Sequence, residues 1–227
     1  MIDLINTFAS AWLEYFGYAF VQNTIFLCVL FFMLSILRSA NAHLKYGVAV
    51  LGIIKLLIPP FLPASLGGVP IVTSSSLIVA SEIAVMPSQS IEPKLTLYGL
   101  LVIIWAAALI LYLASSLLST FRLKWRLRHA RFFKLLNMDG SDYEIYQSAN
   151  ITVPMSVGIR PKRIFVPSSW DVLKPKQQDS LFRHEVAHIR RWDGLFHTLQ
   201  VIAQAIYFFH PLVWLLNGRL NEYREMA

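Results

Sequence analysis

Three long apolar blocks dominate the first half of the chain, at about residues 17–37, 46–62 and 97–118. A helix of roughly 20 apolar residues crosses the hydrocarbon core of a bilayer, which is about 30 Å thick. Each block therefore predicts a transmembrane helix. The stretch 63–94 is rich in Ser, Pro and Val, and its apolar pieces are too short to span, so we expect a loop there.

The second half of the chain begins with a polar, turn-rich region at residues 137–168. It combines turn-forming residues with short runs of β-branched and aromatic residues, a pattern that predicts strands rather than helices. We therefore expect a small sheet. Its predicted strands lie near residues 143–146, 151–153 and 163–166.

Two helical segments follow the predicted sheet. One is predicted over about residues 175–193, between the helix-start signal of Pro175 and the stop signal of Gly194. The next segment, 195–216, is apolar, but only fifteen of its residues precede His210-Pro211, and such a helix is about 22 Å long. That is short of a full crossing, and a proline ends or kinks a helix. A break in the apolar segment is therefore expected.

Composition and charge support a membrane protein and give its orientation. Of the 227 residues, 56% are hydrophobic, the mean hydropathy is +0.54 and the net charge is +7. Basic residues without acidic ones gather at 38–45 and 119–136, but not at the N-terminus or in 63–94. The positive-inside rule then predicts an outside N-terminus, an outer loop at 63–94 and a cytoplasmic arrival after the third span. We expect a transmembrane region at 1–118 and a cytoplasmic-side core at 119–227.

The basic run and the cysteine content bear on two other kinds of site, for nucleic acid and for sulfur-bound metal. The run at 119–136 is explained by topology and by contact with anionic lipid headgroups, so no direct binding of nucleic acid is expected. Cys28 is the single cysteine, which excludes a disulfide within the chain and a cysteine-based metal site.

The strongest chemical signal is His184-Glu185-Val186-Ala187-His188, in the second half of the predicted helix 175–193. Residues four apart on a helix share one face, with their Cβ atoms about 5–6 Å apart. Two imidazoles placed in this way can bind one Zn²⁺ at about 2.0–2.1 Å. Glu185 adjoins the first ligand, where it could take a proton from the attacking water as general base. The pattern therefore predicts a zinc hydrolase site.

A catalytic zinc site normally has a third protein ligand. Glu222 and Glu225 are three residues apart on one predicted helix, so either could face the metal. His197 follows His188 too closely, on what should be the next helix. His210 is the fourth downstream candidate. A ligand in the last helix must return to the motif's side of the membrane, so 195–216 is expected to form a broken helical hairpin or a re-entrant element.

Several pieces of the second half carry a family resemblance when taken together. They are 154–158, 161–167, His184-Glu185-x-x-His188-x-x-Arg191-x-Asp193, His210-Pro211-x-x-Trp214-x-x-Asn217 and Glu225-Met226-Ala227. These pieces, with the three predicted spans before them, resemble the beta-lactam-sensor antirepressor membrane metallopeptidases of the BlaR/MecR type. The resemblance covers most of the chain.

The resemblance implies a gluzincin-like zinc peptidase in a bacterial plasma membrane. In that family the last piece continues as Glu-x-Ala-Cys-Asp, and its Glu, the third zinc ligand, corresponds to Glu225 rather than Glu222. The Cys-Asp pair would follow Ala227, so we expect the core to be incomplete at its C-terminal end. The implied substrates are the protein itself and a cytosolic transcriptional repressor, and a homodimer is compatible with the pattern. No Ser-x-x-Lys occurs, so beta-lactam sensing is not supported by these residues.

The expected fold is thus a mainly α membrane protein with three N-terminal spans, a small α+β zinc-metalloprotease core and a broken apolar hairpin. Asp193 could orient a ligand histidine or anchor Arg191, or form a simple salt bridge at the helix end. His210 could stabilise an oxyanion or serve a structural role beside Pro211. Two other functions stay open: a prenyl-protein-type or other membrane zinc protease, and a non-catalytic membrane signalling module with a vestigial zinc site.

Overall fold

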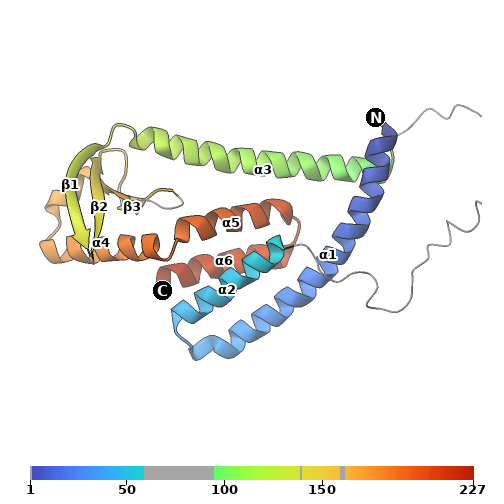
Figure 1. Cartoon of the computed structure of the whole chain (residues 1–227), viewed down its shortest axis with the longest axis horizontal. Helices are drawn as coiled ribbons and strands as arrows, with labels where there is room; N and C mark the ends of the chain where they lie inside the picture. The colour runs from blue at the N-terminus through green and yellow to red at the C-terminus, as the bar shows by residue number, and fades with distance from the viewer. Residues whose placement is uncertain (1, 59–94, 139, 159–161) are drawn as a thin grey trace, which may run out of the picture. The chain divides into compact units, whose positions relative to one another are not determined.

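The computed structural model describes residues 2–58, 95–138, 140–158 and 162–227 (Figure 1). The predicted outer loop 63–94 lies outside this part of the chain. The chain divides into two compact units, one made of residues 1–26 and 58–106 and the other of 27–57 and 107–227. Helices predominate, with one small sheet in the second unit.

Two of the described helices are long and apolar enough to cross a membrane. One covers Ile2–Ser39, which is helix α1 (Ile2–Ile36) with a short 3-10 turn, and the other is α3 (Leu97–Leu127). Both extend beyond the predicted spans, α1 at its beginning and α3 at its end. Helix α3 continues through the first basic residues after the third apolar block and ends at Leu127. The remaining basic residues lie in the turn that follows and in strand β1, which begins at Arg131.

In the first unit, the beginnings of α1 and α3 contact each other through polar and aromatic side chains. The Asn6 side-chain oxygen accepts hydrogen bonds from the Thr96 backbone N–H at 3.0 Å and from its hydroxyl at 2.9 Å. Two turns further along α1, the Trp12 ring lies 4.9 Å from the Trp105 ring. These contacts explain why α1 is helical well before the predicted span.

Of the three predicted spans, the one expected at 46–62 agrees least with the structure, and the corresponding helix is not among the two described helices that are long and apolar enough to cross a membrane. Helix α2 covers Ala42–Leu57, and its last predicted residues lie outside the described part of the chain. Its 16 residues correspond to about 24 Å of helix. Much of α2 is buried by α5 (Asp193–Ile206) and α6 (Pro211–Met226), and the three helices lie side by side (Figure 1). Within the second unit, α2 therefore belongs to the same bundle as the two C-terminal helices.

The sheet has four strands in the order β1-β2-β4-β3. Strands β1 (Arg131–Met138) and β2 (Ser141–Ser148) form an antiparallel hairpin, and Gly140 adopts a left-handed φ of 74° in its turn. Strand β4 (Arg163–Pro167) runs parallel to β2, and the short β3 (Met155–Ser156) pairs antiparallel with β4 at the sheet edge. The predicted strands 143–146 and 163–166 lie within β2 and β4. The prediction at 151–153 was wrong by a few residues, because β3 begins only after Pro154.

Helix α4 (Pro175–Arg190) covers one face of this sheet. Its start is capped where the Gln177 side chain accepts a hydrogen bond from the Lys174 backbone N–H at 3.0 Å. Phe182 and Val186 are buried against the sheet, four residues apart on one face of the helix. The same core contains Tyr143, Ile145, Ile164, Val166 and Trp170. Burial of this face leaves the opposite face of α4 free to carry chemistry.

The apolar segment after α4 is broken as His210-Pro211 predicted. Helix α5 ends at Ile206, and α6 begins at Pro211, whose missing N–H suits a first helical position. Buried polar side chains join the two helices: Gln204 accepts a hydrogen bond from Asn217, and Gln200 donates to the Asn217 backbone carbonyl at 3.3 Å. The result is a helical hairpin that returns the chain toward α4.

Packing of α2 against α1 and α6 predicts a sharp difference between two of its glycines. A Cβ on Gly52 would lie 2.5 Å from Leu30 Cδ2 and 3.3 Å from Leu216 Cδ2, whereas a Cβ on Gly47 meets no atom within 4 Å. We expect Gly52→Leu to lower stability by about 1–3 kcal/mol through overpacking. Gly47→Leu is the control, since both changes gain the same helix propensity. Thermal unfolding of the purified protein in detergent measures the difference, and equal unfolding temperatures would contradict this packing.

Candidate metal centre

Helix α4 presents two histidines on the face that points away from the sheet. His184 Nε2 and His188 Nε2 lie 3.0 Å apart, and the two rings meet edge to face. The arrangement follows from the helical period, because Phe182 and Val186 hold the opposite face in the core. The local sequence alone therefore brings two imidazole nitrogens to one point.

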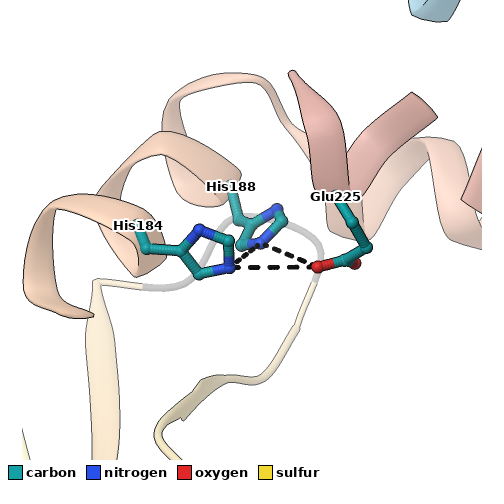
Figure 2. A group of neighbouring side chains, drawn as sticks. All are labelled: His184, His188 and Glu225. Carbon is teal, nitrogen blue, oxygen red and sulfur yellow. Dashed lines mark hydrogen bonds and ion pairs between the residues drawn. The ribbon is translucent and has the colours of Figure 1, made fainter. Parts of the chain in front are cut away.

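Glu225, near the end of α6, completes the group. One of its carboxylate oxygens lies 3.9 Å from His184 Nε2 and 3.9 Å from His188 Nε2. Figure 2 shows the three side chains pointing toward one another from two different helices. Their potential ligand atoms all lie within 4.8 Å of one another. The structure thus brings together the three residues that the sequence analysis proposed as ligands.

The spacing of these atoms fits a single divalent cation. Tetrahedral zinc with ligands at about 2.0–2.1 Å holds neighbouring ligand atoms about 3.3 Å apart. The separations of 3.0 and 3.9 Å lie on either side of that value. Two imidazoles and one carboxylate are also a donor set that zinc hydrolases use, with a fourth position left for water.

A buried carboxylate orients His188. Asp193 Oδ2 lies 2.6 Å from His188 Nδ1, and Arg191 Nη2 lies 3.0 Å from the same nitrogen. The tautomer with its proton on Nδ1 would donate to Asp193 and leave the Nε2 lone pair facing the other two ligand candidates. Arg191 Nη2 donates to the same Asp193 oxygen at 3.0 Å. Asp193 therefore contacts both groups that the sequence analysis considered for it.

The environment of Asp193 keeps it ionised. Burial by itself would raise the pKa of this carboxyl, but hydrogen bonds from His188 and Tyr46 and the charge of Arg191 outweigh it, so the pKa lies below its usual value. An ionised Asp193 is the stronger acceptor for the imidazole N–H. The pair therefore favours the tautomer in which His188 Nε2 is available to a metal.

The turn that places Asp193 is a strained one. Trp192 has φ 60° and ψ 35°, and it is the one non-glycine residue with positive φ in the described part of the chain. Helix α4 ends two residues earlier, so the predicted stop at Gly194 was wrong, and Gly194 lies inside α5. Left-handed backbone at a bulky residue costs free energy and persists where the surroundings require it. Here it lets Asp193 fold back onto His188.

Arg191 connects this turn to the end of α6. Its Nη2 donates to the backbone carbonyl of Arg224 at 2.9 Å, one residue before Glu225. The side chain is largely buried, so its charge is balanced within the protein by Asp193. One guanidinium therefore holds both the carboxylate that orients His188 and the backbone that carries Glu225.

Glu185 lies beside the histidines and lines the same cavity, half-buried. Burial raises the pKa of its carboxyl above the usual value, although the two histidines and a hydrogen bond from the Ser156 backbone N–H act in the opposite direction. A glutamate with a raised pKa accepts a proton more readily than a solvated one. The position and the pKa both suit a general base.

The cavity has a volume of about 550 Å³ and lies between the segment that contains β3 and the helices α4, α5 and α6. One wall is the segment 153–156, which ends in the edge strand β3, and the opposite walls come from α4, α5 and α6. His197 of α5 also lines it. The cavity therefore places an edge strand next to the candidate metal centre.

Two residues considered from the sequence lie elsewhere. Glu222 forms an exposed ion pair with Arg219 at 2.9 Å and is not part of the His184–His188–Glu225 group. His210 is buried at the beginning of α6 and does not line the cavity, so a structural role fits it better than oxyanion stabilisation.

Sequence reasoning missed one residue of the site entirely. The Tyr46 hydroxyl, in α2, donates to Asp193 Oδ1 at 2.7 Å, and both residues are buried. Tyr46 was assigned only to an apolar block, where a tyrosine carries no signal of its own. Its partner is 147 positions away, so no local spacing could have revealed the contact.

Comparison with known proteins gives a family match over most of the chain. The sequence model of one protein family, described as BlaR1 peptidase M56, matches residues 15–227. That range contains all the residues of the candidate centre. A search of curated proteins finds no match to this chain.

The geometry predicts that replacing the two neighbouring glutamates of α6 has different effects on the zinc content. We expect Glu225→Ala to lose bound zinc, because one of the three candidate ligands is removed, and Glu222→Ala to keep about one zinc per chain. Elemental analysis of the purified variants after dialysis measures both. Metal lost only on replacement of Glu222 would show that the wrong glutamate has been assigned.

Proposed function

The chain belongs to the BlaR1 peptidase M56 family, and from that premise we propose that it is a membrane zinc metallopeptidase of the antirepressor type. His184, His188 and Glu225 would hold the zinc, and Glu185 would act as general base. The observation that carries this proposal is the meeting of Glu225, from α6, with the histidine pair of α4. An amphipathic helix with two solvated histidines would not require a distant carboxylate at the same point.

The residues around the centre have defined parts in peptide hydrolysis. Bound zinc supplies a Lewis acid that polarises a carbonyl and makes a water more acidic. Glu185, with its raised pKa, takes the proton of the attacking water and passes it to the leaving amine. The Ser156 N–H fixes the Glu185 carboxylate, and Asp193 fixes the His188 ring.

The edge strand β3 offers a way to bind the substrate. Among the described residues it pairs only with β4, and its residues line the cavity next to Glu185. An extended peptide could add to this edge by main-chain hydrogen bonds, which accept many sequences. The scissile carbonyl would then lie near the histidine pair, and this arrangement favours a peptidase over other zinc hydrolases.

Two apolar helices and the family match indicate that the chain associates with a membrane. We propose that it crosses the membrane several times, with its N-terminus outside and the candidate centre on the cytoplasmic side. The basic residues at the end of α3 support this orientation. The proposed substrates are the chain itself and a cytosolic transcriptional repressor, so that cleavage would switch on a response.

Replacing the proposed base separates metal binding from catalysis. We expect Glu185→Gln to keep about one zinc per chain and to cleave itself or a repressor substrate about 10²–10⁴-fold more slowly. Glu222→Gln is the matched control and should keep both properties. Cleavage is followed by gel and mass spectrometry on protein in detergent or reconstituted in vesicles.

The same experiment distinguishes the competing functions. No zinc in the wild type would end the enzyme proposal, and equal cleavage by wild type and Glu185→Gln would remove Glu185 as the base. Bound zinc with no proteolysis would favour a vestigial site in a signalling module. Cleavage of a prenylated peptide but not of a repressor would favour the prenyl-protein class.

A further inference from the structure

Tyr46 is a helix α2 residue that contacts the candidate centre from outside the protease core sequence. Its ring is buried, with the Phe196 ring of α5 edge-on at 6.3 Å and the Arg191 guanidinium 5.6 Å from the ring centroid. Its hydroxyl donates to Asp193 Oδ1 at 2.7 Å. Both the ring and the hydroxyl thus contact residues that surround His188.

We propose that Tyr46 is a positioning residue for the metal centre, acting on His188 through Asp193. The inference rests on the proposed function, because it assigns a second layer of support to the proposed zinc ligands. Tyr46 touches neither substrate nor ligand atoms, so it is not a catalytic residue. Its hydroxyl holds the Asp193 carboxylate in place, and that carboxylate in turn orients the His188 imidazole.

The bonding of Asp193 shows why a third contact matters. Oδ2 receives hydrogen bonds from His188 and Arg191, whereas Oδ1 receives one from Tyr46. A carboxylate held through one oxygen can rotate, whereas one held through both oxygens cannot rotate without breaking a bond. Partners of metal-bound histidines typically change metal affinity or activity 10–100-fold when they are removed.

The burial of the hydroxyl favours this role over simple packing. A phenylalanine would fill the space between Phe196 and Arg191 equally well, without bringing a polar group into a buried site. A buried hydroxyl costs free energy unless it is hydrogen-bonded, and here it is bonded to the Asp193 carboxylate. The hydroxyl of Tyr46, rather than its ring, is therefore the group that indicates a positioning role.

The contact also makes the centre depend on the placement of α2. That helix is fixed against α6 where Gly52 meets Leu216, so Tyr46 enters the site from a rigid element. The His188–Asp193 pair thus receives support from three helices: α4 and α5 through the chain itself, and α2 through one hydrogen bond. A displacement of α2 would be transmitted to His188 through this bond.

Tyr46→Phe tests the proposal, since it deletes the hydroxyl and keeps the ring. We expect zinc affinity, measured by competition with a chromophoric chelator on the whole 227-residue chain, to fall about tenfold. The absorption bands of the cobalt-substituted protein should shift, because the ligand geometry changes. Tyr143→Phe is the matched control, a buried tyrosine in the sheet core, and should change neither readout.

A double-mutant cycle with Asp193→Asn identifies the route of the effect. If Tyr46 acts through Asp193, the double variant should bind zinc no more weakly than Asp193→Asn alone. Additive losses would overturn the proposal, as would a Tyr46→Phe protein with wild-type affinity and spectrum. Equal weakening by Tyr143→Phe would overturn it too, by showing a general loss of packing. A wild type without zinc would instead remove the proposed function on which the inference rests.

Discussion

The candidate metal centre depends on the return of helix α6 to helix α4. His184 and His188 come together by the helical period alone, but Glu225 reaches them only because the chain reverses between α5 and α6. The hydrogen bonds of Gln200 and Gln204 to Asn217 of α6 are buried within this hairpin. A shift of α6 along α5 would break these buried hydrogen bonds, and leaving a buried amide group without a partner costs free energy. The polar contacts therefore set the register that places Glu225.

A second set of contacts turns this group of side chains into an oriented site. Asp193, placed by the left-handed turn at Trp192, selects the tautomer of His188. Arg191 links Asp193 to the backbone just before Glu225, and Tyr46 adds α2. The candidate ligands from α4 and α6 and the supporting residues from α2 and α5 thus form one connected network. This network explains why an exposed carboxylate such as Glu225, whose side chain is 60% exposed, can still hold a defined position.

The sequence predicted the parts of this arrangement that depend on local chemistry. The histidine spacing placed the motif on a helix, Pro211 predicted the break in the apolar segment, and turn residues indicated a small sheet. The requirement for a third ligand then predicted that the last helix returns. What the sequence could not provide were contacts set by tertiary packing. The Tyr46–Asp193 hydrogen bond, the turn at Trp192 and the position of β3 depend on residues far apart in the chain or on a conformation that a tryptophan rarely adopts. The burial of α2 was missed for the same reason, since an apolar helix facing lipid and one facing other helices have similar composition.

The central claim is that two histidines of α4 and one carboxylate of α6 bind a single zinc ion. X-ray absorption at the zinc edge, on the purified chain loaded with one equivalent of zinc, tests it most directly. The account predicts a first shell of nitrogen and oxygen atoms only, at about 2.0–2.1 Å, with the outer-shell signature of two imidazoles. A signature of three or more imidazoles, a sulfur ligand, or an ion that keeps only water in its first shell would contradict it.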